Sequence, residues 1–224
     1  MIIYLAGDST MADYPPEQAP MAGWGQMLGR LITGGAAVRN EARCGRSSKS
    51  FIREGHFTRI TASIGKGDYL FIQFGHNDEK PGGTEPFTTF QAHLRQYVDA
   101  ARQSEAEPVL FTPVERRRFD GSGKLAPTHG HYPAAVRELA AAMQVPLIDL
   151  TAATGELYRE LGPEASKRLF VWLKPGEHAN YPDGAEDNTH FNETGAVEVA
   201  RLAVRHIAAA GLPLAAFFRN KQVR

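Results

Sequence analysis

The sequence is poor in several features that define whole classes of protein. A single cysteine, Cys44, excludes an intrachain disulfide and any zinc or iron–sulfur site built from several cysteines. One cysteine is also consistent with a reducing compartment. Basic and acidic residues number 25 each, so no net charge attracts nucleic acid or an anionic membrane. We therefore expect recognition of any charged substrate to depend on local groups.

Long apolar runs are also missing. No stretch approaches the roughly 20 apolar residues that span a bilayer, and the N-terminus has neither the basic region nor the cleavage site of a signal peptide. These absences predict a cytoplasmic protein with no membrane or nucleic-acid partner. The 224 residues contain no repeat or linker and suffice for one substantial core, so residues 1–224 are expected to form a single domain.

The first ten residues, MIIYLAGDST, are an apolar run that breaks into a polar turn. A continuous apolar run is typical of a parallel strand that is buried on both faces, because a half-exposed strand would alternate. Gly7 permits a sharp turn, which places Ser9 at the carboxyl end of the strand, where open α/β sheets bind their ligands. Ser9 is therefore a candidate nucleophile. The alternative is that Ser9 caps a helix.

Strand-like and helix-like segments alternate along the rest of the chain. The predicted strands are 2–6, 36–42, 68–74, 108–112 and 146–150, and the predicted helices are 23–32, 47–64, 88–104, 133–143, 151–161 and 193–210. This alternation predicts a three-layer α/β/α sandwich around a five-stranded parallel sheet. Polar segments 11–22, 75–87, 113–131 and 162–192 are expected to be loops, mostly on one side of that sheet.

A serine nucleophile needs a base, and the best candidate is His190 in the segment 187–190 (DNTH), just before the last predicted helix. A carboxylate and an imidazole in one turn can touch each other. Asp187 would then fix the tautomer of the ring while its other nitrogen faces Ser9. The alternative is that Asp187 or Asn188 caps the helix and that His190 is a surface residue.

Four separated motifs resemble those of the SGNH hydrolase superfamily, also called the GDSL family, and they occur in the order found in that family. They are Gly7-Asp8-Ser9, Gly45 after the second strand, Gly75 to Asp78 (GHND) after the third strand, and Asp187 to His190 (DNTH) near the end. The resemblance covers nearly the whole chain. It implies a flavodoxin-like fold and a serine esterase that needs no metal or other cofactor.

The resemblance also implies a role for each matching residue. Ser9 would be the nucleophile, His190 the general base and Asp187 the acid that orients the base. The backbone N–H groups of Ser9 and Gly45, with the side-chain amide of Asn77, would form the oxyanion hole. Three such donors can together supply several kcal/mol of transition-state stabilisation.

A closer resemblance is to the rhamnogalacturonan acetylesterases. The shared segments are GDST at 7–10, GWG at 23–25, GHND at 75–78, DNTHFN at 187–192 and the Gly-Ala pair at 195–196. This resemblance implies that the substrate is an acetylated pectic carbohydrate, either a polymer or an oligosaccharide.

Three further residues, Arg46, His76 and Trp172, are candidates for substrate binding. Arg46, beside Gly45, is the best-placed partner for the carboxylate of an acidic sugar, whereas 116–118 (three arginines) is typical of a solvated loop. His76 is expected to shape the pocket. Trp172 lies in a loop-rich region and could stack on a sugar, and Trp24 has the spacing of a core residue.

Two weaker patterns are set aside. The segment 121–124 (GSGK) lacks the earlier glycine and the Ser or Thr of a phosphate-binding loop. His129 and His131 have no cluster of possible metal ligands nearby in the sequence, and we expect them in a solvated loop.

Two alternative functions are kept. The chain could be a lipase- or thioesterase-like hydrolase of longer acyl esters, which a deep apolar acyl pocket would favour. It could also be a non-catalytic carbohydrate-binding module, because fold does not fix function. The complete set of nucleophile, base and oxyanion donors argues against the second alternative.

Overall fold

Five parallel strands form the central sheet of the computed structural model, which describes residues 1–219. The strands are β1 (Ile2–Gly7), β2 (Ala37–Asn40), β3 (Tyr69–Gln73), β4 (Glu107–Phe111) and β5 (Leu147–Ile148). Their order across the sheet is β2-β1-β3-β4-β5, and every pairing is parallel. This is the flavodoxin-like order, so the predicted fold class is confirmed.

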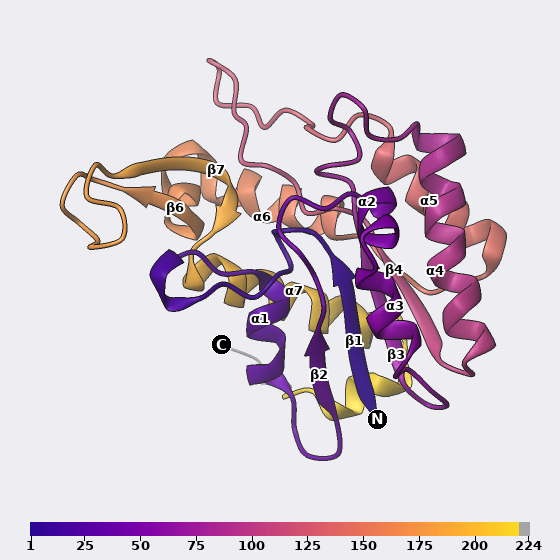
Figure 1. The fold of residues 1–224 in the computed structure, drawn as a ribbon. Helices are drawn as coiled ribbons and strands as arrows, with labels where there is room; N and C mark the ends of the chain where they lie inside the picture. The colour runs from indigo at the N-terminus through magenta and orange to yellow at the C-terminus, as the bar shows by residue number, and fades with distance from the viewer. Residues whose placement is uncertain (220–224) are drawn as a thin grey trace.

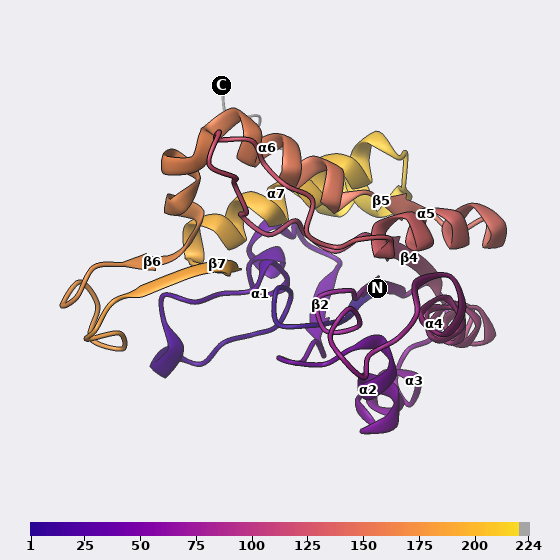
Figure 2. The same cartoon turned by 90° about the horizontal axis from the view of Figure 1, so that it is seen from above.

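Helices cover both faces of the sheet and complete the three layers (Figure 1). One face packs against α1 (Trp24–Leu28), α6 (Leu150–Ala165) and α7 (Glu193–Ala209). The other packs against α2 (Ser48–Arg53), α3 (His56–Thr61), α4 (Gln91–Gln103) and α5 (Tyr132–Met143). Figure 2 shows α6 and α7 on one side of the strands and α2, α3 and α4 on the other. Short helical turns lie at Pro16–Gln18, Gly29–Leu31, Pro86–Phe90, Ser166–Leu169 and Pro213–Phe217.

Side chains of β1 alternate between two buried clusters. Ile3 and Leu5 enter the cluster beneath α1 and α7, whereas Tyr4 and Ala6 enter the cluster beneath α2 to α5. All four are at most 1% exposed. Because both faces of β1 are covered, its sequence is continuously apolar, which explains why the sequence predicted this strand well.

Three of the predicted elements that differ from the structure do so for a visible local reason. The predicted helix 47–64 is divided into α2 and α3 at Gly55, whose φ of 77° lies in the left-handed region that favours glycine. The predicted helix 88–104 begins earlier, as a π-helical turn at Pro86–Phe90. The predicted strand 146–150 pairs with β4 only at two residues, because Asp149 already caps α6 by accepting a hydrogen bond from the N–H of Ala152.

The sequence predicted that the segment 162–192 is mostly loop, and this prediction is wrong. It contains the antiparallel hairpin of β6 (Phe170–Leu173) and β7 (Ala185–Phe191), and the DNTH segment lies on β7. The hairpin extends to the left of the sheet in Figure 1, beside the segment 11–22. Asn180 Nδ2 donates hydrogen bonds to the backbone oxygens of Pro16 and Ala19, each over 2.9 Å, and so joins these two segments.

None of the helices within residues 1–219 combines the length and the apolar character needed to cross a membrane.

Candidate active site

Ser9 lies in a tight turn at the carboxyl end of β1. Asp8 Oδ1 accepts hydrogen bonds from the backbone N–H and the hydroxyl of Thr10, over 3.0 and 2.8 Å, which fixes the turn. An added Cβ at Gly7 would lie 2.7 Å from Met11 Sδ and 3.0 Å from the backbone oxygen of Gln73 on β3, so a side chain there would crowd the turn. Ser9 is 8% exposed and lies well before the first residue of α1, so it is not the cap of that helix.

Three side chains form a continuous hydrogen-bonded relay. Ser9 Oγ lies 3.0 Å from His190 Nε2, and His190 Nδ1 lies 2.7 Å from Asp187 Oδ2. Asp187 Oδ1 accepts hydrogen bonds from the backbone N–H groups of Thr189 and His190, over 2.7 and 2.8 Å. The structure therefore brings together the predicted nucleophile, base and orienting acid.

The environment of Asp187 determines the tautomer of His190. Burial opposes ionisation of Asp187, but hydrogen bonds from His190 and Thr189 outweigh burial and lower the pKa of this carboxyl below its usual value. The ionised carboxylate accepts the Nδ1–H of His190, which leaves Nε2 as an acceptor toward the Ser9 hydroxyl. The capping alternative is wrong, because Asn192 caps α7 by accepting from the N–H of Gly195.

The predicted oxyanion donors lie on neighbouring segments. Arg43 donates its backbone N–H to Gly7 over 3.0 Å, so the turn that contains Gly45 runs beside the end of β1. Gly45 has a φ of 75° and is exposed. In the part of the chain that the structure describes, the backbone N–H groups of Ser9 and Gly45 donate to no protein acceptor. Both are therefore free to donate to a bound ester.

The amide of Asn77 is held in one orientation by a partner on each side. Its Nδ2 donates to the backbone oxygen of Arg46 over 3.1 Å, which leaves the second N–H of Nδ2 for another acceptor. Its Oδ1 accepts from Lys80 Nζ over 2.7 Å. Asn77 is 9% exposed, so this orientation is fixed at the edge of the buried region.

The loop that carries Asn77 is anchored by its neighbour Asp78. Asp78 accepts hydrogen bonds from the backbone N–H and the hydroxyl of Ser48 at the start of α2, over 3.1 and 2.5 Å, and from the Thr84 hydroxyl over 3.2 Å. Burial raises the pKa of Asp78 to about 6 despite these bonds.

His76 was predicted among the substrate-contacting residues, and the structure does not support a direct contact. Its side chain is 3% exposed, and Nδ1 lies 3.0 Å from Asp8 Oδ2. Burial lowers the pKa of His76 to about 4, although Asp8 acts in the opposite direction. Because the neutral ring donates Nδ1–H to Asp8, His76 supports the nucleophile turn from behind. The prediction that it shapes the site from its loop remains consistent with this position.

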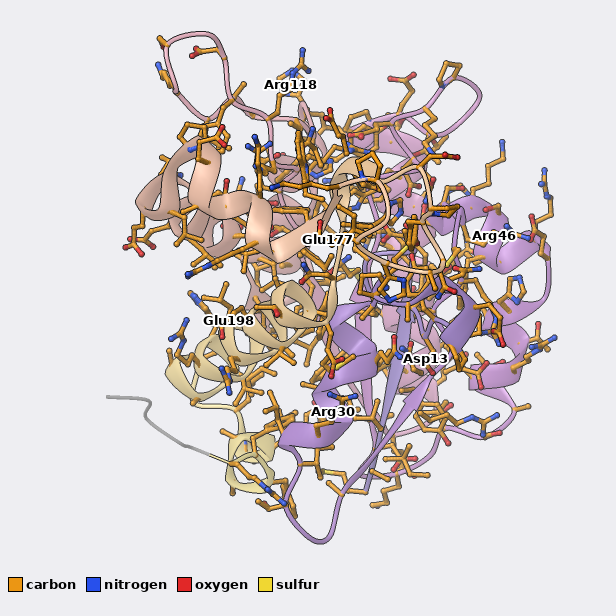
Figure 3. The ribbon with its side chains drawn as sticks, turned by 90° about the vertical axis from the view of Figure 1, so that its left-hand side faces the viewer. Asp13, Arg30, Arg46, Arg118, Glu177 and Glu198 are labelled. Atoms are coloured by element: carbon orange, nitrogen blue, oxygen red, sulfur yellow. The ribbon has the colours of Figure 1, made fainter. Side chains whose placement is uncertain are left out.

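Arg46 does not present a free guanidinium to the site. Its Nε donates to Glu54 over 2.5 Å, and Nη1 donates to the backbone oxygen of Cys44 over 3.0 Å. Figure 3 shows Arg46 at the periphery of the molecule. Its backbone oxygen, which binds Asn77, has the closer connection to the site. A sugar carboxylate could bind Arg46 Nε only if this nitrogen left Glu54.

Trp172 lies on β6 and lines a cavity of about 490 Å³ together with Lys167 and Lys174. Its indole Nε1 donates to Asn188 Oδ1 over 3.0 Å, and Lys167 Nζ lies 4.4 Å from the ring centroid. The ring is thus engaged by protein groups. A contact between Trp172 and a sugar stays a prediction, whereas the expectation that Trp24 is a core residue is confirmed, since it is 0% exposed.

The segment 116–118 is not the solvated charge run that the sequence predicted. Arg117 is 8% exposed and donates to Ser166 and Asn188, over 3.0 and 2.7 Å. Arg116 donates to acceptors on two other segments, and Arg118 alone of the three is exposed. Figure 3 shows Arg118 at the top of the molecule.

The expectation for His129 is also wrong. It is 1% exposed and contacts Glu79, rather than lying in a solvated loop. Within residues 1–219, no group of three or more His, Cys, Asp or Glu side chains is arranged to hold a metal ion.

Sequence reasoning missed the contacts that support the relay and the oxyanion donor. These are Asp8, which binds His76; Lys80, which binds Asn77; and Arg116, which binds Thr189. Lys80 follows Asn77 closely enough for its sequence position to suggest contact. The other two pairs lie 68 and 73 residues apart, so nothing in the spacing could reveal them.

Comparison with known proteins places the chain among hydrolases. Residues 5–197 match the model of the GDSL-like Lipase/Acylhydrolase family. Over 212 residues the chain is 56% identical to the rhamnogalacturonan acetylesterase RhgT of Bacillus subtilis (strain 168), which covers 95% of this chain and 91% of RhgT.

Solved structures share the same architecture. The crystal structure of YxiM from Bacillus subtilis is similar, with a TM-score of 0.81 and 31% identity over 94% of this chain. This chain spans 57% of that structure. The structure of an acetylxylan esterase from Geobacillus stearothermophilus matches with a TM-score of 0.64 and 19% identity. The matched region is 92% of this chain and 93% of the esterase chain. At that identity the likeness concerns the fold alone.

Proposed function

This chain belongs to the GDSL-like lipase/acylhydrolase family, and we propose that it is a serine esterase that removes acetyl groups from rhamnogalacturonan. One observation carries the proposal. A complete relay of Ser9, His190 and Asp187 occurs in a chain that is 56% identical to a rhamnogalacturonan acetylesterase over nearly its whole length. The relay supports the chemistry, and the identity supports the substrate.

In the acylation half-reaction, Ser9 Oγ attacks the carbonyl carbon of the acetyl ester while its proton moves to His190 Nε2, 3.0 Å away. Asp187 stabilises the imidazolium that forms. The developing oxyanion receives hydrogen bonds from Asn77 and from the backbone N–H groups of Ser9 and Gly45. His190 then donates the proton to the sugar oxygen, which leaves as an alcohol, and Ser9 carries the acetyl group.

In the deacylation half-reaction, His190 Nε2 accepts a proton from water, and the resulting nucleophile attacks the acetyl-Ser9 carbonyl. The same donors hold the second oxyanion. Collapse of this intermediate releases acetate and returns the proton to Ser9. The step needs no group beyond the relay, the donors and water.

A lipase- or thioesterase-like hydrolase is the competing function, and the family description itself includes lipases. The identity to RhgT favours the acetylesterase, because the relative covers almost the whole chain and therefore the loops around the site as well. The relay also weighs against a non-catalytic carbohydrate-binding module, which would have no need of a base bonded to a serine.

The direct test is a comparison of kcat/KM on four substrates: acetylated rhamnogalacturonan fragments, acetylated xylan oligomers, 4-nitrophenyl acetate and 4-nitrophenyl octanoate. We expect the highest value on the rhamnogalacturonan fragments and a lower value on octanoate than on acetate. A higher value on octanoate would support the lipase-like function. Equal values on the two carbohydrates would make the protein a general carbohydrate acetylesterase.

A further inference from the structure

Arg116 joins two segments that carry groups of the proposed reaction. Its Nε donates to Thr189 Oγ1 over 3.2 Å, and Thr189 directly precedes the proposed base on β7. Its two other nitrogens donate to the carboxylate of Glu79 and, over 3.4 Å, to the backbone oxygen of His76. His76 and Glu79 flank the segment that contains Asn77. One guanidinium therefore holds the segment of the base against the segment of the oxyanion donor.

The backbone from which this side chain extends is also fixed. The N–H of Arg116 lies 3.1 Å from Glu115 Oε1 and 3.2 Å from Thr128 Oγ1. The N–H of Arg117 donates to the backbone oxygen of Asn188 over 2.9 Å. The segment 112–131, which connects β4 with α5, is therefore attached to β7 directly.

Glu79 extends the network toward the nucleophile turn. Its Oε2 lies 3.0 Å from Nδ1 of the buried ring of His129. That ring packs edge-on against His76, with centroids 4.4 Å apart, and His76 binds Asp8. Burial opposes ionisation of Glu79, but hydrogen bonds from His129 and Arg116 outweigh it and lower the pKa of Glu79. An ionised Glu79 thus lies between the Arg116 guanidinium and the ring of His129.

We propose that Arg116 is a positioning residue, which sets the placement of Asn77 relative to His190 without touching the ester. The proposal rests on the proposed function, because it concerns the same reaction. An oxyanion donor and a base must be placed against one carbonyl group, and a displacement of about 1 Å can cost about a hundredfold in rate. The planar fork of arginine donates in fixed directions from three nitrogens to separated acceptors, whereas lysine donates from a single nitrogen.

The test compares Arg116→Met with Arg118→Met, using 4-nitrophenyl acetate as substrate. Methionine keeps an apolar stem and removes the fork. We expect Arg116→Met to lower kcat about ten- to a hundredfold with KM changed by less than about threefold. Arg118 is exposed, and its side chain makes no hydrogen bond within residues 1–219, so Arg118→Met should leave both constants unchanged.

A double-mutant cycle separates positioning from a general loss of structure. If Arg116 acts through Asn77, then Arg116→Met should cost much less in an Asn77→Ala background than in the wild type. Fully multiplicative losses would overturn the proposal. So would a kcat of a folded Arg116→Met protein within twofold of the wild-type value.

Two further measurements cover the other outcomes. If Arg116→Met does not fold, Thr189→Val is the alternative variant, because it removes only the acceptor of Arg116 Nε. We expect Thr189→Val to lower kcat about three- to tenfold, as the loss of one hydrogen bond would. An unchanged kcat in this variant would reject the proposal. Ser9→Ala serves as the reference for the function. Hydrolysis that does not depend on Ser9 would refute the proposed function, whereas hydrolysis that depends on Ser9 but not on Arg116 would refute only the positioning role.

Discussion

His190 Nε2 lies 3.0 Å from Ser9 Oγ, although 181 residues separate them in the chain. Backbone pairing near both residues produces this contact. The N–H of Ala22, after the nucleophile turn, donates to the backbone oxygen of Phe191 over 2.9 Å, and Met21 forms a β-bridge with Asn192. The relay is therefore positioned by main-chain hydrogen bonds between its two segments.

Asn77→Ala should lower kcat about a hundred- to a thousandfold and change KM much less. The reason is that a donor aimed at the developing oxyanion acts mainly in the transition state. Steady-state kinetics on 4-nitrophenyl acetate give both constants. A change confined to KM would instead assign Asn77 to substrate binding.

Lys80→Met should lower kcat roughly three- to tenfold, less than the loss in Asn77→Ala, because it removes one charged partner of the amide and keeps the amide itself. Lys80 Nζ lies 2.7 Å from Asn77 Oδ1 and fixes which atom of the amide faces the site. The matched control is Lys66→Met. Lys66 precedes β3, at the amino ends of the strands and away from the site, and it pairs with Glu105. Equal losses in the two variants would reject this role for Lys80.

His76 should make the folded protein less stable in mild acid. Burial lowers its pKa to about 4 in the folded state, whereas a histidine in an unfolded chain titrates near about 6.5. Between these values the unfolded chain binds a proton that the folded protein does not, so the free energy of unfolding falls as the pH drops through this window. The loss attributable to His76 should approach about 1.4 kcal/mol per pH unit.

The measurement is denaturant unfolding of the wild type and of His76→Asn at several pH values. Asparagine can still donate to Asp8 but does not titrate. The difference in stability should therefore shift in favour of the variant as the pH falls from about 6.5 to about 4. Asp78 contributes in the opposite direction, because its raised pKa favours the folded state at low pH. Subtracting the free energy of unfolding of the variant from that of the wild type cancels this contribution. Parallel curves would contradict the buried, neutral state of His76.

Trp24→Phe should lower the free energy of unfolding by about 1 to 3 kcal/mol, because it leaves a buried acceptor without its donor. Trp24 Nε1 donates to Gln73 Oε1 over 2.7 Å, and Gln73 is 0% exposed. Gln73 Nε2 also donates to Thr10 Oγ1 over 2.8 Å, so the loss should extend to the nucleophile turn. Equilibrium unfolding of the two proteins checks the value, and a difference below about 0.5 kcal/mol would contradict it.

The sequence allowed β1 and β3 to be predicted because these strands are apolar and covered on both faces. Strand β7 was missed for the opposite reason. Its sequence AEDNTHF is mostly polar, and all its residues except Phe191 are exposed or half-buried, so no apolar alternation marks it. The break at Gly55 was also missed, because a glycine inside an amphipathic segment does not by itself reveal a left-handed φ.

Sequence reasoning anticipated which side chains lie together where these side chains belong to short motifs, and it missed charges that are neutralised by distant partners. Ser9, Asp187 and His190 lie in recognisable segments and meet in the structure. Arg46 was expected to bind an acidic sugar because of its position beside Gly45, and Arg116 was expected in a solvated loop, yet both bind carboxylates of the protein itself. Such pairings depend on tertiary packing, which sequence spacing does not encode.

The central claim is that Ser9 carries the acetyl group, and acetate release from acetylated rhamnogalacturonan by wild type and Ser9→Ala tests it most directly. We expect Ser9→Ala to lower kcat by at least about a thousandfold, because only the oxyanion donors and substrate binding would remain to assist hydrolysis. Its unfolding midpoint should stay near that of the wild type. Acetate release at close to the wild-type rate by a folded Ser9→Ala protein would contradict the mechanism.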